Sequence, residues 1–208
     1  MKRIFLIGLL FLWGSLTSAQ NKTKNLIIVT LDGLRWQEVF RGADSTLVNI
    51  KEYNPDKKGI TANFIRESPE ARRSLLMPFF WSTIVKKGQI YGNRDLGNKA
   101  EVANTFRFSY PGYNELFTGF PDPRVSSNDK IPNSNTNLLE YINKQKGFEG
   151  KVIAFTSWDV FPFILNDKRS GIIVNSGLTD LNIPGMSERL KLLNEMQHLS
   201  PGFVAEDM

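Results

Sequence analysis

Two short runs of apolar, mostly β-branched residues place the tightest limit on the fold of this chain. The first is N-L-I-I-V-T-L at residues 25–31, and the second is K-V-I-A-F-T at residues 151–156. Neither run alternates polar and apolar residues, so both are typical of strands buried on both faces of a parallel sheet. A third strand is predicted at residues 172–175, and a short one at 89–91.

Helical patterns alternate with these strands. Helices are predicted at residues 77–87, 137–146 and 187–199, with a short helix around 36–40. Asn137 and Glu140 are placed as a capping box, and Gly147 is the expected stop. Residues 42–74 and 121–135 are polar and are expected to be irregular. The predicted fold class is α/β, with a mostly parallel central sheet flanked by helices.

The first residues indicate export. Lys2 and Arg3 precede a short apolar run that ends at Trp13, and small residues follow up to Ala19. This pattern predicts a signal peptide at residues 1–19 and a mature domain at 20–208. The apolar run is shorter than the roughly 20 residues of a spanning helix, so no membrane span is expected after cleavage. The expected location is the periplasm or the outside of the cell.

Composition narrows the class of partner. The chain has 208 residues and no cysteine, so an exported domain of this kind depends on its core rather than on disulfides. Its formal charge is +5, and removal of Lys2 and Arg3 with the signal peptide leaves 5 − 2 = +3. The basic residues are scattered in pairs rather than gathered in a stripe, which argues against a nucleic-acid partner. The oligomeric state is left open.

Two positions could carry chemistry. Asp32 follows the first strand directly, at the carboxyl end where open α/β sheets bind ligands, although Asp32-Gly33 could simply form a tight turn. Ser109 begins S-Y-P-G-Y-N-E-L-F-T-G, and Pro111 suits the first turn of a helix. Ser109 is therefore either an ordinary helix cap or a nucleophile at a helix start, activated by a metal ion.

Together the two motifs resemble the alkaline phosphatase superfamily. V-T-L-D-G-L-R and the later Ser109 motif are most similar to its phosphodiesterase and nucleotide pyrophosphatase branch and to phosphoglycerate-mutase-like relatives. The resemblance covers roughly residues 25–175. It implies that Asp32 is a metal ligand, that Ser109 is the metal-bound nucleophile, and that the cofactor is a divalent metal: two zinc ions, with manganese or magnesium as alternatives.

The chain departs from the family pattern at three points. Gly112 stands where relatives have a phosphate-binding asparagine, and Asn114 is the substrate-binding candidate in its place. Tyr113 replaces the arginine of the sulfatase motif, which together with the absence of cysteine disfavours sulfatase chemistry. The chain has one histidine, His198, expected at the surface, whereas the family's metal site takes three.

The predicted function is therefore metal-dependent hydrolysis of small-molecule phosphate mono- or diesters by a serine nucleophile. The remaining metal ligands are expected beyond Met208, in a longer protein of which this chain is the N-terminal part. The alternative is a non-catalytic exported pseudoenzyme or binding domain that kept the fold. Mutase-like activity is a further possibility.

Overall fold

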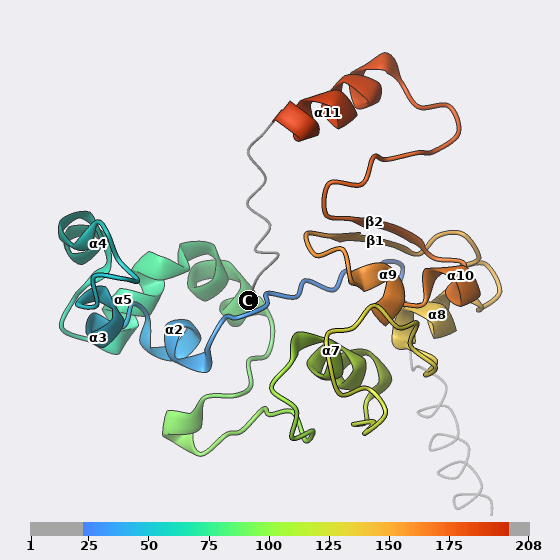
Figure 1. Cartoon of the computed structure of the whole chain (residues 1–208). Coiled ribbons are helices and arrows are strands. Elements are labelled where there is room, and N and C mark those ends of the chain that lie inside the picture. Colours follow the sequence, from blue (N-terminus) through green and yellow to red (C-terminus); the bar gives the residue numbers. More distant parts are fainter. Residues whose placement is uncertain (1–22, 200–208) are drawn as a thin grey trace, which may run out of the picture. The chain divides into compact units, whose positions relative to one another are not determined.

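A computed structural model describes residues 23–199 of the chain (Figure 1). The chain divides into two compact units, Met1–Leu34 and Arg35–Met208, and each is considered by itself. The predicted signal peptide at residues 1–19 lies outside the described residues.

Residues 23–34, the described part of the first unit, contain no strand. The predicted strand at residues 25–31 is therefore wrong for this structure. Its apolar side chains are exposed, Ile27 at 83% and Val29 at 77%. A strand needs a neighbour for its backbone hydrogen bonds, and none is present in this segment. Asp32 and Gly33 form a turn, with Gly33 at φ 72°.

The N-terminal part of the second unit is helical. Its elements are α2 (Trp36–Arg41), α3 (Ser45–Val48), α4 (Lys57–Phe64), α5 (Pro69–Leu76), a π-helix η1 (Phe80–Ile84), α6 (Val85–Lys87) and the 3-10 helix η2 (Arg94–Leu96). The short helix expected after Asp32 is confirmed by α2, which buries Phe40. The helix predicted at 77–87 is confirmed in its C-terminal part, with a π-helical turn inside it, and ends at Gly88 as expected.

Two predictions fail in this part. Residues 42–74 are not irregular, because α3, α4 and α5 form there. Each has a local cap that the hydrophobic pattern does not reveal; in α5, for example, the Ser68 side chain accepts a hydrogen bond from Ala71 N and Pro69 occupies the first turn. Residues 89–91 form no strand.

The C-terminal part of the second unit is the α/β portion. It contains α7 (Ser109–Thr118), α8 (Leu138–Asn143), β1 (Ile153–Thr156), α9 (Phe161–Ile164), α10 (Asp167–Ser170), β2 (Ile173–Ser176) and α11 (Glu188–Leu199). The strands at 151–156 and 172–175 are confirmed to within two residues, and the loop at 121–135 is confirmed. The helix at 137–146 is confirmed in its first half only, because it ends at Asn143 rather than at Gly147.

Strands β1 and β2 pair in parallel, with Ile153 opposite Ile173 and Thr156 opposite Ser176. The chain crosses between them through α9 and α10 (Figure 1). This two-stranded parallel sheet among helices agrees with the α/β class. No helix among residues 23–199 is both long and apolar enough to cross a membrane.

The core of this part lies between α7, α9 and one face of the sheet. The buried members of this cluster are Tyr110, Tyr113, Phe117, Val160, Phe161, Ile164 and Leu165. Ala154 and Val174 pack against them from the strands. The alternate strand residues Ile153, Phe155 and Ile173 are exposed at 44%, 67% and 45%, so the other sheet face is uncovered among the described residues.

Candidate active site

Ser109 is the first residue of α7 and is half-buried. The N-cap position belongs to Phe108, so the interpretation of Ser109 as the helix cap is wrong by one residue. No other residue in the described part of the chain hydrogen-bonds to the Ser109 hydroxyl. The hydroxyl is thus available for chemistry.

The first turn of α7 has fewer backbone donors for an anion than a usual helix start. Tyr110 N donates to Asn128 Oδ1 at 3.1 Å, and Pro111 has no N–H. Of the four N–H positions that a helix start leaves unpaired, only those of Phe108 and Ser109 remain to meet a phosphate oxygen. Anion binding beside Ser109 therefore needs help from side chains.

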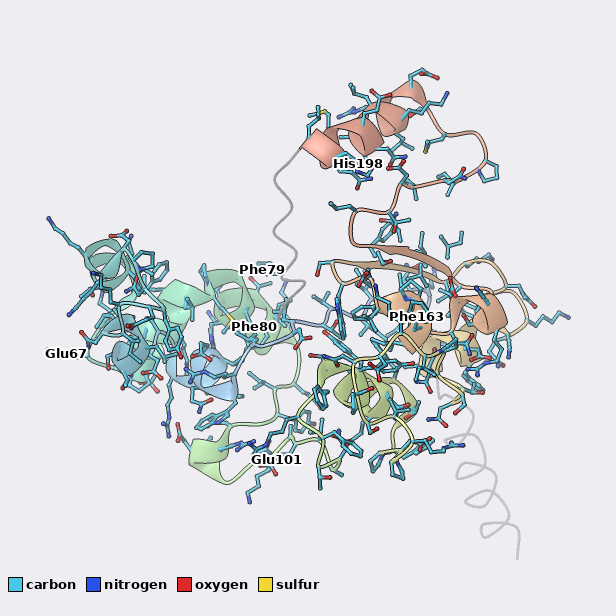
Figure 2. All side chains as sticks on the ribbon, viewed as in Figure 1. Glu67, Phe79, Phe80, Glu101, Phe163 and His198 are labelled. Atoms are coloured by element: carbon cyan, nitrogen blue, oxygen red, sulfur yellow. The ribbon has the colours of Figure 1, made fainter. Side chains whose placement is uncertain are left out.

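Tyr110 anchors this turn from inside the protein. Its hydroxyl donates to the carbonyl oxygens of Ile131 at 2.7 Å and Phe163 at 3.0 Å; Phe163 is labelled on α9 in Figure 2. Burial raises the pKa of Tyr110 to about 12, against the opposing charge of Arg169. The phenol therefore stays protonated at neutral pH and keeps both carbonyls as partners.

Asn114 lies one turn further along α7 and is only 1% exposed. Its Oδ1 accepts hydrogen bonds from Nδ2 of Asn133 at 3.0 Å and of Asn135 at 3.1 Å. A substrate would have to compete with these two asparagines for the Asn114 amide. Substrate binding by Asn114 remains a prediction, and its observed contacts support the inner face of α7.

These contacts belong to a buried asparagine ladder made of Asn133, Asn135 and Asn137. The three are 2%, 8% and 1% exposed, while Ser134 and Thr136 between them are exposed. Asn135 Nδ2 also donates to Asp122 Oδ2 at 2.7 Å, and Asn137 caps α8 through Glu140 N at 2.9 Å. The cap at Asn137 is predicted by the sequence but the ladder was not, although its period of two is visible in N-S-N-T-N.

Glu140 is fully buried and completes this polar core. Its carboxylate accepts hydrogen bonds from Arg169 Nη2 at 2.8 Å and Lys144 Nζ at 2.6 Å. It therefore does not reach back to Asn137 as a capping-box residue. Burial acts to raise the pKa of Glu140, but the Arg169 and Lys144 bonds outweigh it, so the pKa is below its ordinary value. Arg169 also donates to the carbonyls of Asn133 and Asn135, at 2.8 and 2.7 Å.

Asp32 is exposed and lies at the turn that ends the first unit. Asp32 and Ser109 belong to different units. Across the described ranges, no three or more His, Cys, Asp or Glu side chains gather into a group that could hold a metal ion. His198 is exposed on α11, as expected (Figure 2), and its Nε2 lies 2.7 Å from Asp180 Oδ1.

The chain was compared with protein-family models, with curated proteins and with solved structures, and none of them matches it.

Proposed function

We propose that this protein hydrolyses phosphate esters of small molecules outside the cytoplasm, with Ser109 as the nucleophile. The observation that carries the proposal is the hydroxyl of Ser109, which starts a ten-residue helix and has no hydrogen-bond partner among residues 23–199. A serine used only for structure would be expected to cap the helix, and Ser109 does not. The buried contacts of Tyr110 and Asn114 hold α7 firmly behind it.

The proposal includes a larger parallel sheet of the alkaline phosphatase kind, as the resemblance implies, of which β1 and β2 would form part. Such sheets bind ligands at the carboxyl ends of their strands.

Asp32 would serve there as a ligand of a divalent metal, with zinc favoured and with manganese or magnesium as alternatives. The described residues do not fit a complete metal centre, because Asp32 and Ser109 supply two oxygen ligands and structural or catalytic zinc takes at least three from the protein. The metal dependence therefore rests on the resemblance. A bound divalent metal lowers the pKa of a hydroxyl that it contacts.

The chemistry assigned to the chain itself is a displacement at phosphorus. Ser109 Oγ loses its proton and forms a bond to phosphorus, while the bond from phosphorus to the ester oxygen breaks and the alcohol leaves with a proton. Water then displaces Ser109 from the phosphoseryl intermediate and gives a proton to Ser109 Oγ, which releases inorganic phosphate from a monoester or a phosphate monoester from a diester. The alternative mutase reaction would return the phosphoryl group to another hydroxyl instead of to water.

The test is the substitution Ser109→Ala in the native gene product, with zinc supplied. Turnover of 4-nitrophenyl phosphate or of bis(4-nitrophenyl) phosphate should fall by roughly a thousandfold or more, because the attacking atom is gone. The matched control is Ser126→Ala, at an exposed serine in the loop after α7 that should leave turnover unchanged. Equal activity of the wild type and Ser109→Ala would remove Ser109 from the mechanism.

A second candidate function is a non-catalytic exported binding domain. It is favoured by the absence of a metal-ligand group within residues 23–199 and by the pairing of the single histidine with Asp180. Zinc binding by the native gene product separates the two candidates: the hydrolase should bind about two zinc ions per chain, measured by elemental analysis after dialysis, and the binding domain none.

A further inference from the structure

The helix formed by residues 78–87 exposes large apolar side chains that the core does not use. Phe79, which is labelled in Figure 2, is 66% exposed, and Ile84 is 45% exposed. Trp81 is directed the other way, because its ring meets that of Phe40 edge-on with 6.0 Å between the centroids. The helix is therefore attached to the protein through Trp81 and presents Phe79 and Ile84 to water.

A π-helical turn brings these apolar side chains onto one side of the helix. In η1 the N–H of Val85 donates to Phe80 O, five residues back, so residues five apart lie roughly one turn apart. Phe79 and Ile84 have this spacing. Lys87 comes three residues after Ile84 in α6, and residues at that spacing are neighbours on an α-helix. We name Phe79, Ile84 and Lys87 the outer face of this helix.

The charge along this part of the chain has a single sign. Residues 71–94 contain five basic residues and no acidic one. Lys86 and Lys87, at the end of the helix, are exposed and form no ion pair or hydrogen bond with other residues in the described part of the chain. The positive charge next to Ile84 is therefore available to an anionic surface.

This combination of side chains fits a lipid surface better than a protein partner. Lysine is depleted in protein–protein interfaces. At a membrane surface, by contrast, aromatic and aliphatic side chains enter the boundary between headgroups and acyl chains, while lysines meet the anionic headgroups. Such a contact needs no groove, and Phe79 and Ile84 project from the surface of a helix.

We propose that the outer face, together with Lys86, binds the surface of anionic lipid bilayers. Phe79 and Ile84 enter the headgroup region, and Lys86 and Lys87 lie at the lipid phosphates. The inference is independent of the proposed function, because no residue of the candidate active site takes part. It assigns to the helical part of the second unit a role in holding the protein at a membrane surface.

The experiment measures partition of the native gene product, by cosedimentation, onto vesicles of phosphatidylcholine with and without about one-third phosphatidylglycerol. Partition should be at least about tenfold stronger on the anionic vesicles and should weaken between about 50 and 500 mM salt. Lys86→Gln with Lys87→Gln should weaken it about tenfold or more, since each lysine near such a surface contributes about fivefold. Phe79→Ser with Ile84→Ser should also weaken it by about tenfold or more, because less apolar area is buried.

Two matched controls separate the outer face from other parts of the chain. Lys57→Gln with Lys58→Gln removes two exposed lysines that form no ion pair among residues 23–199, from α4, whose side chains include no large exposed apolar one. Ile27→Ser with Val29→Ser removes two exposed apolar side chains from the first unit. Each control should change partition onto the anionic vesicles by less than about twofold.

Equal partition of the wild type onto both kinds of vesicle, or onto neither, would overturn the inference. So would an unchanged partition in the Phe79 and Ile84 variant, or an equal loss in either control. Self-association of the wild type without vesicles, abolished by the same two substitutions, would show instead that the outer face joins two copies. Turnover of 4-nitrophenyl phosphate in solution should be the same in every variant, so a failure of ester hydrolysis and a failure of lipid binding are distinguished.

Discussion

The second unit has two parts, and each is stabilised internally by a different set of polar groups. Between Ser109 and Ser176, buried asparagines and one fully buried glutamate are bonded to each other and to main-chain carbonyls, around an apolar cluster. Between Trp36 and Lys87, the only buried side chains are Phe40 and Asn54, and arginines, together with Trp81, donate hydrogen bonds between the short helices. The first part is stabilised mainly by buried contacts, and the second mainly by hydrogen bonds from arginines nearer its surface.

The helical part shows how surface arginines can tie short helices together. Arg72 donates to the carbonyls of Arg41, Arg66 and Glu67, at 3.2, 2.8 and 3.0 Å. Arg73 donates to Phe40 O at 3.0 Å, and its guanidinium lies 3.9 Å from the Trp81 ring centroid. These bonds satisfy carbonyls at helix ends while the arginine stems cover apolar surface. Because they are accessible to water, each should contribute less than a buried bond.

The largest loss of stability is expected from a substitution at Arg169. Arg169→Met leaves the Glu140 carboxylate fully buried with Lys144 as its remaining charged partner. We expect the free energy of unfolding to fall by about 3 kcal/mol, because a buried charge loses its main counter-charge. The measurement is urea unfolding of the full chain, with amide exchange of β1 and β2 as the local readout.

Lys168→Met is the control for that substitution. Lys168 is an exposed neighbour in α10, so its loss should change the free energy of unfolding by about 0.5 kcal/mol or less. If Arg169→Met is no worse than Lys168→Met, or if it loosens α2 as much as β1, the asparagine and glutamate core is not what stabilises this part.

The helical part has its own weak point at Gly42. This residue has φ 75°, and a Cβ built on it would lie 2.3 Å from Arg73 N. Gly42→Ala should therefore lower the free energy of unfolding by about 2 kcal/mol or more, through backbone strain and through displacement of the helix that carries Arg72 and Arg73. Urea unfolding with amide exchange in α2 and α5 would measure it.

Gly97→Ala is the comparison for a glycine with positive φ and no close contact. Gly97 has φ 73° and ψ 4°, the left-handed region, whereas Gly42 has ψ −156°, a combination that is essentially restricted to glycine; nothing lies within 4 Å of the Gly97 Cβ position. It should cost only the strain, about 1 kcal/mol. Equal losses at both positions would mean that the close approach of Gly42 to α5 contributes nothing.

The smallest expected effect is a change in how the unfolding free energy depends on pH, and this change is seen only in acid. Hydrogen bonds from Arg124 and Asn135 hold the pKa of Asp122 well below its usual range, and for Glu140 the bonds from Arg169 and Lys144 outweigh burial and lower its pKa. A carboxylate whose folded pKa is depressed stabilises the fold above its unfolded pKa, about 4. That stabilisation is lost as the pH falls through the folded pKa.

Glu140→Gln should therefore flatten the pH dependence of the unfolding free energy below about pH 4, as measured by urea unfolding at a series of pH values. Glu67→Gln, at an exposed residue that forms no ion pair among the described residues, should leave the slope unchanged. The same slope in wild type and Glu140→Gln would show that Glu140 keeps an ordinary pKa in the folded protein.

The same contrast explains how far the sequence predicts the structure. Apolar runs and caps predicted β1, β2, α2 and the start of α8, because in these elements local pattern and tertiary packing agree. They also predicted α11, which forms without a buried residue. The predictions failed where no local sequence pattern indicates the structure. Helices α3 to α5 depend on caps and on arginine bonds from distant residues, and the run at 25–31 has the composition of a strand without a neighbouring strand in its own unit.

For the candidate site, the sequence predicted the helix at Ser109 but not the residues behind it. The partners of Asn114 lie about 20 positions away, and Glu140 meets Arg169 across 29 residues, so no short window contains either pair.

The exposed stretch at residues 25–31 also has a consequence for aggregation. Leu26, Ile27, Val29 and Leu31 stand 59% to 83% open to water, without a proline or a charge among them to discourage pairing with an identical stretch. Such a sequence is a template for intermolecular cross-β stacking. We expect preparations of this chain to aggregate at high concentration, because the exposed stretches of two molecules can pair with each other as strands.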